Sequence, residues 1–283
     1  MLADCLAHLD AQTYRDFEII VVDSSTDDAT AEVMQSRPTA IYTRITGKNN
    51  MPQARNVGIA HARGDIVAFI DDDCMVRAQW LANLVAAYDD PAVGGSGGRI
   101  LDQNRPAIQS ESRVGVILPE GTVIGNFAIK TDVPRDVDYI QGGNMSFRRA
   151  ILELSGGFDP WFGGDNSSEE LDQCMRVRKR GHRLRFVPSA EVEHLSAPRS
   201  ADVVSRNYFS PRRIYFQARN RTYLYFKNRG LEREYCIRTW YDIRGWAILA
   251  VRKHSPGAWR RLIASITGHI GGALLALARK PRD

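Results

Sequence analysis

Two apolar segments that end abruptly in acidic residues constrain the fold of this chain most. Residues 17–22 lead to Asp23, and residues 66–70 lead directly to Asp71, Asp72 and Asp73. A nearly continuous apolar run of this length is typical of a parallel strand buried on both faces. Helical patterns alternate with these runs, so the sequence predicts an α/β sheet whose ligands bind outside the carboxyl ends of the strands.

The periodicity and the capping residues predict the remaining elements. We expect further strands at residues 40–45, 183–187 and 191–195, and an irregular stretch at 94–138. We expect helices at residues 2–9, 29–35, 56–63, 80–88, 148–154 and 169–180, and a helical region beyond residue 200. The helix at residues 2–9 should be the crossover from an earlier parallel strand, so we expect a strand upstream of Met1.

The charge divides the chain into two parts. The net charge is 38 − 33 = +5, but residues 201–283 carry 17 Lys and Arg against 5 Asp and Glu, while residues 1–200 carry 21 against 28. We therefore expect an acidic domain at 1–200 and a basic, aromatic-rich helical extension at 201–283. The four cysteines lie far apart with no CxxC pair, which favours reduced thiols and a cytoplasmic location over a zinc site or disulfide framework.

Four groups of side chains could carry chemistry. Asp71–Asp73 offer oxygen ligands for Mg²⁺ or Mn²⁺, or form a solvated acidic turn. Asp23 could bind a base or ribose, or cap a turn. The acidic residues Glu169, Glu170 and Asp172 could complement a helix dipole or supply a general base. His194 could be structural, or could contact a metal or phosphate.

Six motifs in this order resemble the family 2 glycosyltransferases, which have the GT-A fold. The matching segments are residues 16–30 (DFEIIVVDSSTDDAT), 54–58 (ARNVG), 64–73 (GDIVAFIDDD), 142–149 (GGNMSFRR), 156–159 (GGFD) and 169–176 (EELDQCMR). The resemblance covers residues 1–200. It implies a Rossmann-like nucleotide-diphospho-sugar transferase fold with a mainly parallel mixed sheet. It also implies that the family's first strand, with its uridine-contacting loop, would precede Met1, so we expect an incorrect start or a truncated reading frame.

The resemblance also implies roles for individual residues. Asp71 and Asp73 match the metal motif, with His194 as a further metal or phosphate contact. In the family's acidic pair the second member is the base, which makes Glu170 the candidate here, with Glu169 and Asp172 as alternatives. The donor-binding positions implied are Asp23, Ser25, Arg55, Asn56, Asp71, Asp72, Gly143 and Asn144.

The arginines and aromatic side chains that alternate over residues 206–261 leave three interpretations open. They could belong to helices packed on the domain, to a surface that meets an anionic membrane, or to a nucleic-acid site. No recognised nucleic-acid motif accompanies them, so we expect no nucleic-acid partner. The most apolar segment, residues 262–278, is interrupted by Ser265, Thr267 and His269.

We therefore expect an inverting glycosyltransferase, acting on a hexosyl or deoxyhexosyl donor linked to UDP, GDP or dTDP. Its cofactor would be Mn²⁺ or Mg²⁺, its acceptor a glycan or lipid-linked molecule, and its pathway surface polysaccharide synthesis. We expect it in the cytoplasm, either free or peripheral on the inner face of the membrane. The alternatives are a Mg²⁺-dependent phosphohydrolase using Asp71–Asp73 and an inactive, truncated homologue that acts as a membrane-associated binding protein.

Overall fold

The computed structural model describes residues 1–46, 50–102, 106–108, 111–119, 121–195, 209–228 and 232–279. The chain forms two compact units. The first contains Met1–Val116, Ile124–Pro160 and Gln173–Ala197, and the second contains Ile117–Val123, Trp161–Asp172 and Pro198–Asp283. The predicted domain boundary at residue 200 lies outside the described residues.

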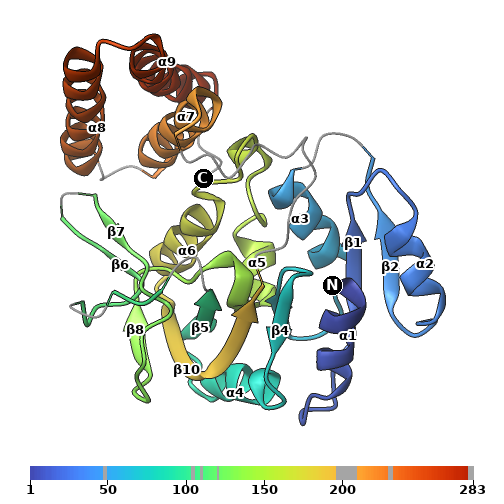
Figure 1. Ribbon diagram of the computed structural model, residues 1–283. Coiled ribbons are helices and arrows are strands. Elements are labelled where there is room, and N and C mark those ends of the chain that lie inside the picture. The colour runs from blue at the N-terminus through green and yellow to red at the C-terminus, as the bar shows by residue number, and fades with distance from the viewer. Residues whose placement is uncertain are drawn as a thin grey trace. The chain divides into compact units, whose positions relative to one another are not determined.

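A six-stranded mixed sheet forms the centre of the first unit (Figure 1). Its strands are β3 (Ile66–Phe69), β4 (Cys74–Val76), β5 (Val93–Asp102), β8 (Arg135–Val137), β9 (Met145–Arg148) and β10 (Arg183–His194). The order is β3-β9-β5-β10-β4, with β8 also paired to β10. Within this described sheet only β5 and β10 pair in parallel. The sheet is mixed, as expected, but the prediction that it is mainly parallel is wrong, because β9 lies antiparallel between β3 and β5, and β4 and β8 pair with β10 in antiparallel orientation.

A separate two-stranded parallel sheet holds β1 (Ile20–Asp23) and β2 (Ile41–Arg44), and Figure 1 shows it apart from the larger sheet. The short strands β6 (Val116–Ile117) and β7 (Val123–Ile124) pair with each other. The helices that accompany the sheets are α1 (Leu2–Asp10), α2 (Ala29–Gln35), α3 (Met51–His61), α4 (Trp80–Ala86) and α5 (Arg149–Leu154). Helix α6 (Glu169–Lys179) begins in the second unit and continues into the first.

Most predicted elements are present with shifted ends. The bounds of α2 are those expected from the sequence, whereas α3 begins five residues before the predicted start. The reason is a cap: the side chain of Asn50 accepts a hydrogen bond from the backbone of Gln53, and Pro52 suits the first turn. The two strands expected at 183–187 and 191–195 are one strand, β10, with a shift in register between Val187 and Val192.

Strand β5 contradicts the expectation of irregular structure across residues 94–138. Its first half reads Val-Gly-Gly-Ser-Gly-Gly, a composition that weakens strand propensity. The glycines serve close packing between neighbouring strands. A Cβ at Gly98 would lie 1.8 Å from the carbonyl oxygen of Ala190, and one at Gly95 would lie 2.7 Å from both Leu184 and Phe147. Strand β5 therefore forms through close contact between backbones. It lacks the run of apolar side chains from which the other strands were predicted.

A hydrophobic core beside β4 and β10 packs helix α4 against these two strands. Trp80, Leu81 and Leu84 of α4 pack with Cys74 and Val76 of β4 and with Val187, Ala190 and Val192 of β10. Burying each large apolar side chain stabilises the fold by about 1.5–3 kcal/mol. Three cysteines, Cys5, Cys74 and Cys174, are buried free thiols, whereas Cys236 is exposed.

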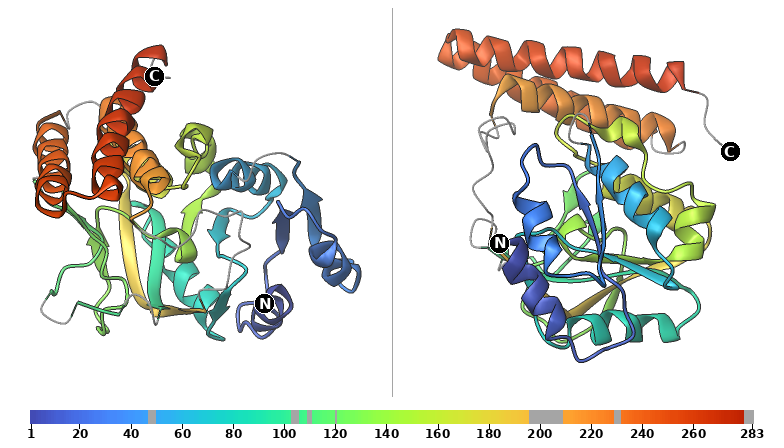
Figure 2. Two further views of the ribbon diagram at one scale, coloured as in Figure 1. Left: turned by 45° about the horizontal axis from the view of Figure 1, so that its top comes forward. Right: turned by 90° about the vertical axis from the view of Figure 1, so that its right-hand side faces the viewer.

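Beyond residue 208, the described part of the second unit contains three helices: α7 (Pro211–Lys227), α8 (Glu232–Lys253) and α9 (Pro256–Ala278). The hydroxyls of Ser210 and Ser255 cap α7 and α9, each followed by a proline in the first turn. Figure 2 shows α7 and α9 side by side. Their backbones approach closely at glycines: a Cβ at Gly272 would lie 2.3 Å from the carbonyl oxygen of Arg219. The predicted helical extension is therefore confirmed.

Candidate functional site

The acidic turn after β3 contributes two of its three carboxylates to a cluster of ligating atoms. One atom each from Asp71, Asp73, Cys74 and His194 lies within 4.8 Å of all the others. Asp72 is exposed, and the cluster does not include it. Residues 71–73 lie in a turn closed by a hydrogen bond from the Cys74 backbone N–H to the Asp71 carbonyl (3.1 Å), and this turn leaves Asp72 exposed while Asp73 is buried.

Strand register explains how residues far apart in sequence reach this cluster. His194 is the last residue of β10, where it pairs with Cys74 of β4 on one side and with Asp102 of β5 on the other. A single row across three strands therefore carries a thiol, an imidazole and a carboxylate. Asp102 and Cys74 were not predicted from the sequence. Only Ile100 and Leu101 separate Arg99 from Asp102, so no apolar run comparable to those before Asp23 and Asp71 marks Asp102.

His194 is held at both ring nitrogens by carboxylates. Its Nδ1 lies 3.0 Å from Asp102 Oδ2, and its Nε2 lies 3.2 Å from Asp73 Oδ1. The hydrogen bond with Asp73 raises the pKa of His194 above its ordinary value, against burial, which lowers it. If Nδ1–H donates to Asp102, the lone pair of Nε2 and the Asp73 carboxylate face the same space. A divalent cation in that space could be bound by both groups.

The donor set fits a hard divalent cation. Two carboxylates are ligands typical of Mn²⁺ and Mg²⁺ sites, whereas an imidazole ligand is typical of transition metals and so favours Mn²⁺ over Mg²⁺. A metal-bound histidine commonly donates its other ring N–H to a carboxylate, as His194 can to Asp102. Burial and the charge of Asp71 raise the pKa of the Cys74 thiol. The Cys74 Sγ lies 3.7 Å from the carbonyl oxygen of Gly143, to which the thiol donates. Asp71, Asp73 and His194 are therefore the residues that would hold the metal.

Gly143 and Asn144, in the short helix η2 (Gly142–Asn144), have different surroundings. Gly143 borders the cluster: a Cβ there would lie 3.5 Å from Asp71 Oδ2. Asn144 is fully buried, where its amide accepts from Trp80 Nε1 (2.9 Å) and donates to the carbonyl of Ala190 (2.7 Å). The Asn144 side chain therefore ties α4 to β10.

Arg55 and Asn56 of α3 pack against the turn at residues 156–158. Asn56 accepts a hydrogen bond from the backbone N–H of Phe158 (2.7 Å) and donates to its carbonyl (2.6 Å). The Arg55 guanidinium lies over the Phe158 ring, 5.2 Å from its centroid, and close to Gly142. Asn56 thus fixes the turn, while Arg55 presents a buried cation beside η2.

Asp23 and Ser25 form the turn after β1. Asp23 Oδ1 accepts from the Ser25 backbone (2.8 Å), while Oδ2 accepts from Tyr42 (2.9 Å) and from Arg44 (3.1 Å). Burial alone would raise the pKa of Asp23, but these hydrogen bonds hold it below the ordinary value. Because a carboxylate has about four acceptor positions, a base or ribose could still add one bond.

The three acidic residues of α6 belong to the second unit and differ in exposure. Glu169 and Asp172 are buried, whereas Glu170 is half-buried. Asp172 is bound within that unit by Lys227 Nζ (2.8 Å) and Asn228 Nδ2 (3.0 Å), both at the end of α7. Of the three, Glu170 is therefore the most exposed carboxylate.

The loop before Glu170 is anchored by α7. Asn220, fully buried, donates from Nδ2 to Asp165 Oδ1 (3.0 Å) and to the carbonyl of Phe162 (3.2 Å). Asn166 and Ser168 adopt positive φ values of 54° and 70°, which cost of order 1–3 kcal/mol each. Within the second unit, α7 therefore supports the acidic loop and is more than a basic appendage.

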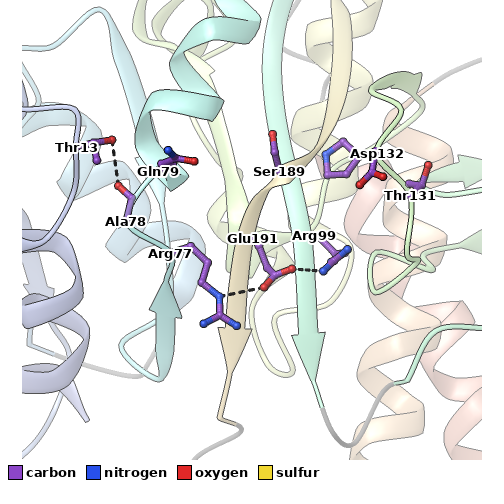
Figure 3. Close-up of a pocket in the computed structure, with 10 residues that line it drawn as sticks. Thr13, Arg77, Ala78, Gln79, Arg99, Thr131, Asp132, Ser189 and Glu191 are labelled. Atoms are coloured by element: carbon purple, nitrogen blue, oxygen red, sulfur yellow. Dashed lines mark hydrogen bonds and ion pairs between the residues drawn. The ribbon is translucent and has the colours of Figure 1, made fainter.

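A separate cleft of about 550 Å³ contains none of the predicted site residues. Figure 3 shows Glu191 between two arginines that contribute to its lining. Glu191 accepts from Arg77 Nε at 3.0 Å and also pairs with Arg99. These charges offset one another, and the other carboxylate that lines the cleft, Asp132, is not part of the cluster at His194.

Comparison with solved structures defines the class of the fold. The chain is similar to the structure of GalNAc-T7 with UDP, GalNAc and Mn²⁺ (TM-score 0.56, 16% identity, 82% of this chain and 50% of that chain). It is also similar to the mannosyltransferase PcManGT from Pyrobaculum calidifontis in complex with GDP-Man and Mn²⁺ (TM-score 0.53, 18% identity, 98% and 83%). The fold is that of the GT-A glycosyltransferases, as the sequence predicts.

The family follows from the sequence comparisons. Residues 1–155 match the model of glycosyl transferase family 2, and the chain belongs to that family. Among curated relatives, it is 29% identical over 168 residues to the pre-mycofactocin glycosyltransferase of Mycobacterium tuberculosis (strain H37Rv). The match covers 55% of this chain and 32% of that protein, so the chain spans about a third of this relative's length.

Proposed function

We propose that this protein is an inverting glycosyltransferase that moves a sugar from a nucleotide diphosphate to a glycan or lipid-linked acceptor. The observation that carries the proposal is the convergence of Asp71, Asp73 and His194, with Asp102 behind the imidazole. In a family 2 glycosyltransferase, such a cluster suits the diphosphate of the donor. The Mn²⁺ and nucleotides named in the two similar structures support the same cofactor and donor class.

Each group in the proposed reaction has a defined task. Glu170 accepts the proton of an acceptor hydroxyl, and that oxygen attacks the anomeric carbon from the face opposite the diphosphate. The bond between the anomeric carbon and the diphosphate oxygen breaks, and the nucleoside diphosphate leaves with the electron pair. A divalent cation bound by Asp71, Asp73 and His194 would offset the charge that develops on the diphosphate. Asp102 holds the His194 ring in orientation.

The remaining assignments are part of the same proposal. The donor is a hexosyl or deoxyhexosyl nucleotide of UDP, GDP or dTDP, with Asp23, Ser25 and Arg55 on the nucleotide side. Gly143 allows the donor to approach the backbone beside Asp71, since it has no side chain to fill that space. The product enters a surface polysaccharide, and the protein acts in the cytoplasm at the inner face of the membrane.

A donor screen with a matched pair of variants tests this function. We expect one nucleotide sugar to raise the melting temperature in the presence of Mn²⁺. Glu170→Gln should keep that shift but lower turnover about 10²–10⁴-fold, because only the proton acceptor is lost. Glu153→Gln, on an exposed turn of α5, is the control and should be fully active. Unchanged turnover in Glu170→Gln would reject the role of Glu170.

The same screen separates the alternatives. Hydrolysis of the nucleotide sugar at an undiminished rate without acceptor would favour a Mg²⁺-dependent phosphohydrolase. Failure to bind any UDP, GDP or dTDP sugar would favour a binding protein without transferase activity.

A further inference from the structure

One face of helix α9 carries a continuous row of exposed apolar side chains. Ile263 is 58% exposed, Ile270 54%, Leu274 61% and Leu277 77%. Trp259 and Ile266 are exposed along the same row. The spacing of three and four residues places all six on one side of the helix. We call these six residues the α9 stripe.

The opposite side of α9 is already occupied by α7. Ala264, Ser265, Gly268, His269 and Gly272 are buried, and a Cβ at Gly268 would lie 2.4 Å from the carbonyl oxygen of Tyr215. The His269 imidazole is 2.8 Å from the Thr222 hydroxyl, inside this contact. The α9 stripe therefore lies on the side of α9 opposite to α7, and exposed apolar patches of this kind mark interaction sites.

The charges around the stripe favour an anionic lipid surface as its partner. Residues 243–282 contain no Asp or Glu and eight basic residues: Arg244, Arg252, Lys253, Arg260, Arg261, Arg279, Lys280 and Arg282. None of the eight lies between Leu262 and Ala278, so the part of the stripe from Ile263 to Leu277 carries no Lys or Arg, and the cations lie toward its two ends. Apolar residues with flanking arginines and a tryptophan at one end are typical of a helix in a membrane interface.

The packing of α9 on α7 also decides between a helix that crosses the membrane and one that lies on it. By length and composition alone, α9 could cross a bilayer. Helix α7 carries five cations, namely Arg212, Arg213, Arg219, Arg221 and Lys227. Spanning in the docked state would move these charges toward hydrocarbon, where charged side chains are strongly disfavoured. A helix lying in the interface keeps α7 in water.

We infer that the α9 stripe inserts into the surface of an anionic bilayer, with α9 parallel to the membrane plane and still packed on α7. This inference rests on the membrane location in the proposed function, but not on the proposed chemistry. Docking of this kind would hold the enzyme at the surface where a lipid-linked acceptor is presented.

Flotation of the full chain with vesicles tests the docking surface. We expect binding to phosphatidylcholine vesicles containing phosphatidylglycerol, and weaker binding without it. Ile270→Glu with Leu274→Glu should lower the affinity about tenfold or more, because two inserted side chains are lost. The matched control is Val133→Glu with Leu154→Glu, which adds the same charges at residues 62% and 72% exposed elsewhere. Equal loss in both double variants would overturn the inference, as would full binding by the stripe variant.

Labelling of the two helix ends tests the orientation. In a Cys236→Ser background, Ser255→Cys and Arg279→Cys place thiols at the ends of α9. An impermeant maleimide added outside vesicles should label both ends, whereas protection of one end would show a spanning helix and overturn the inference. A lipid-independent dimer that Ile270→Glu with Leu274→Glu dissociates would assign the stripe to a second copy and would also overturn it. Donor binding is measured in parallel, so failure of the catalytic proposal is distinguished from failure of this one.

Discussion

Replacing Asp102 by asparagine should weaken Mn²⁺ binding without any change in the metal ligands themselves. Asp102 Oδ2 lies 3.0 Å from His194 Nδ1, and the Asp102 side chain is 5% exposed. The charged carboxylate fixes which nitrogen carries the proton and increases the basicity of Nε2. Asparagine keeps the shape and one acceptor oxygen but removes the charge. Loss of such an outer carboxylate costs about 10–100-fold in metal affinity, or about 1.4–2.7 kcal/mol.

Calorimetric titration of the full chain with Mn²⁺ alone provides the measurement, and it does not depend on activity. Asp73→Asn is the positive control because it removes a proposed ligand. Asp136→Asn, at a half-exposed surface carboxylate, is the matched negative control. If Asp102→Asn binds Mn²⁺ within twofold of the wild type while Asp73→Asn is impaired, the argument that Asp102 orients His194 is refuted.

Three further predictions concern stability. Gly98→Ala should destabilise the first unit by about 1–3 kcal/mol or more in urea unfolding, since its Cβ meets a backbone carbonyl; Gly245→Ala, with open space, should not. Burial lowers the pKa of His269 to about 4, so the unfolded chain binds more protons below its own pKa near 6.5. The contribution of His269 to the free energy of unfolding should therefore be fully present above pH 6.5 and be lost as the pH falls toward 4, which lowers the free energy of unfolding by about 2–3 kcal/mol. His269→Gln should reduce this dependence of the free energy of unfolding on pH. Asn220→Ala should cost about 1–3 kcal/mol by leaving buried acceptors without their donor; an unchanged denaturation midpoint would contradict its anchoring role.

The sequence was sufficient to predict an element and its functional residues where both lie within one short segment. The apolar run of β3 ends at the three aspartates, so both the strand and the candidate metal ligands could be predicted together. Helix α2 was predicted to its end residues because an acidic, hydroxyl-rich turn precedes it. In both cases the information lies within about ten residues.

The contribution of Asp102 could not be predicted because it depends on tertiary register. Asp102 and His194 are 92 residues apart and meet only because β5 and β10 pair in parallel. The glycines that allow this pairing are the same residues that hid β5 from a propensity argument. Likewise, nothing in the sequence around Asp172 indicates that Lys227 and Asn228 neutralise and bury it.

Titration of the wild-type chain with UDP-, GDP- and dTDP-sugars, with Mn²⁺ and with EDTA, tests the central claim most directly. The account predicts that one nucleotide sugar binds in Mn²⁺, and that EDTA or Asp73→Asn weakens that binding at least about tenfold through loss of contacts to the diphosphate. Binding of equal strength without metal, or no binding of any of the three donors, would contradict the account.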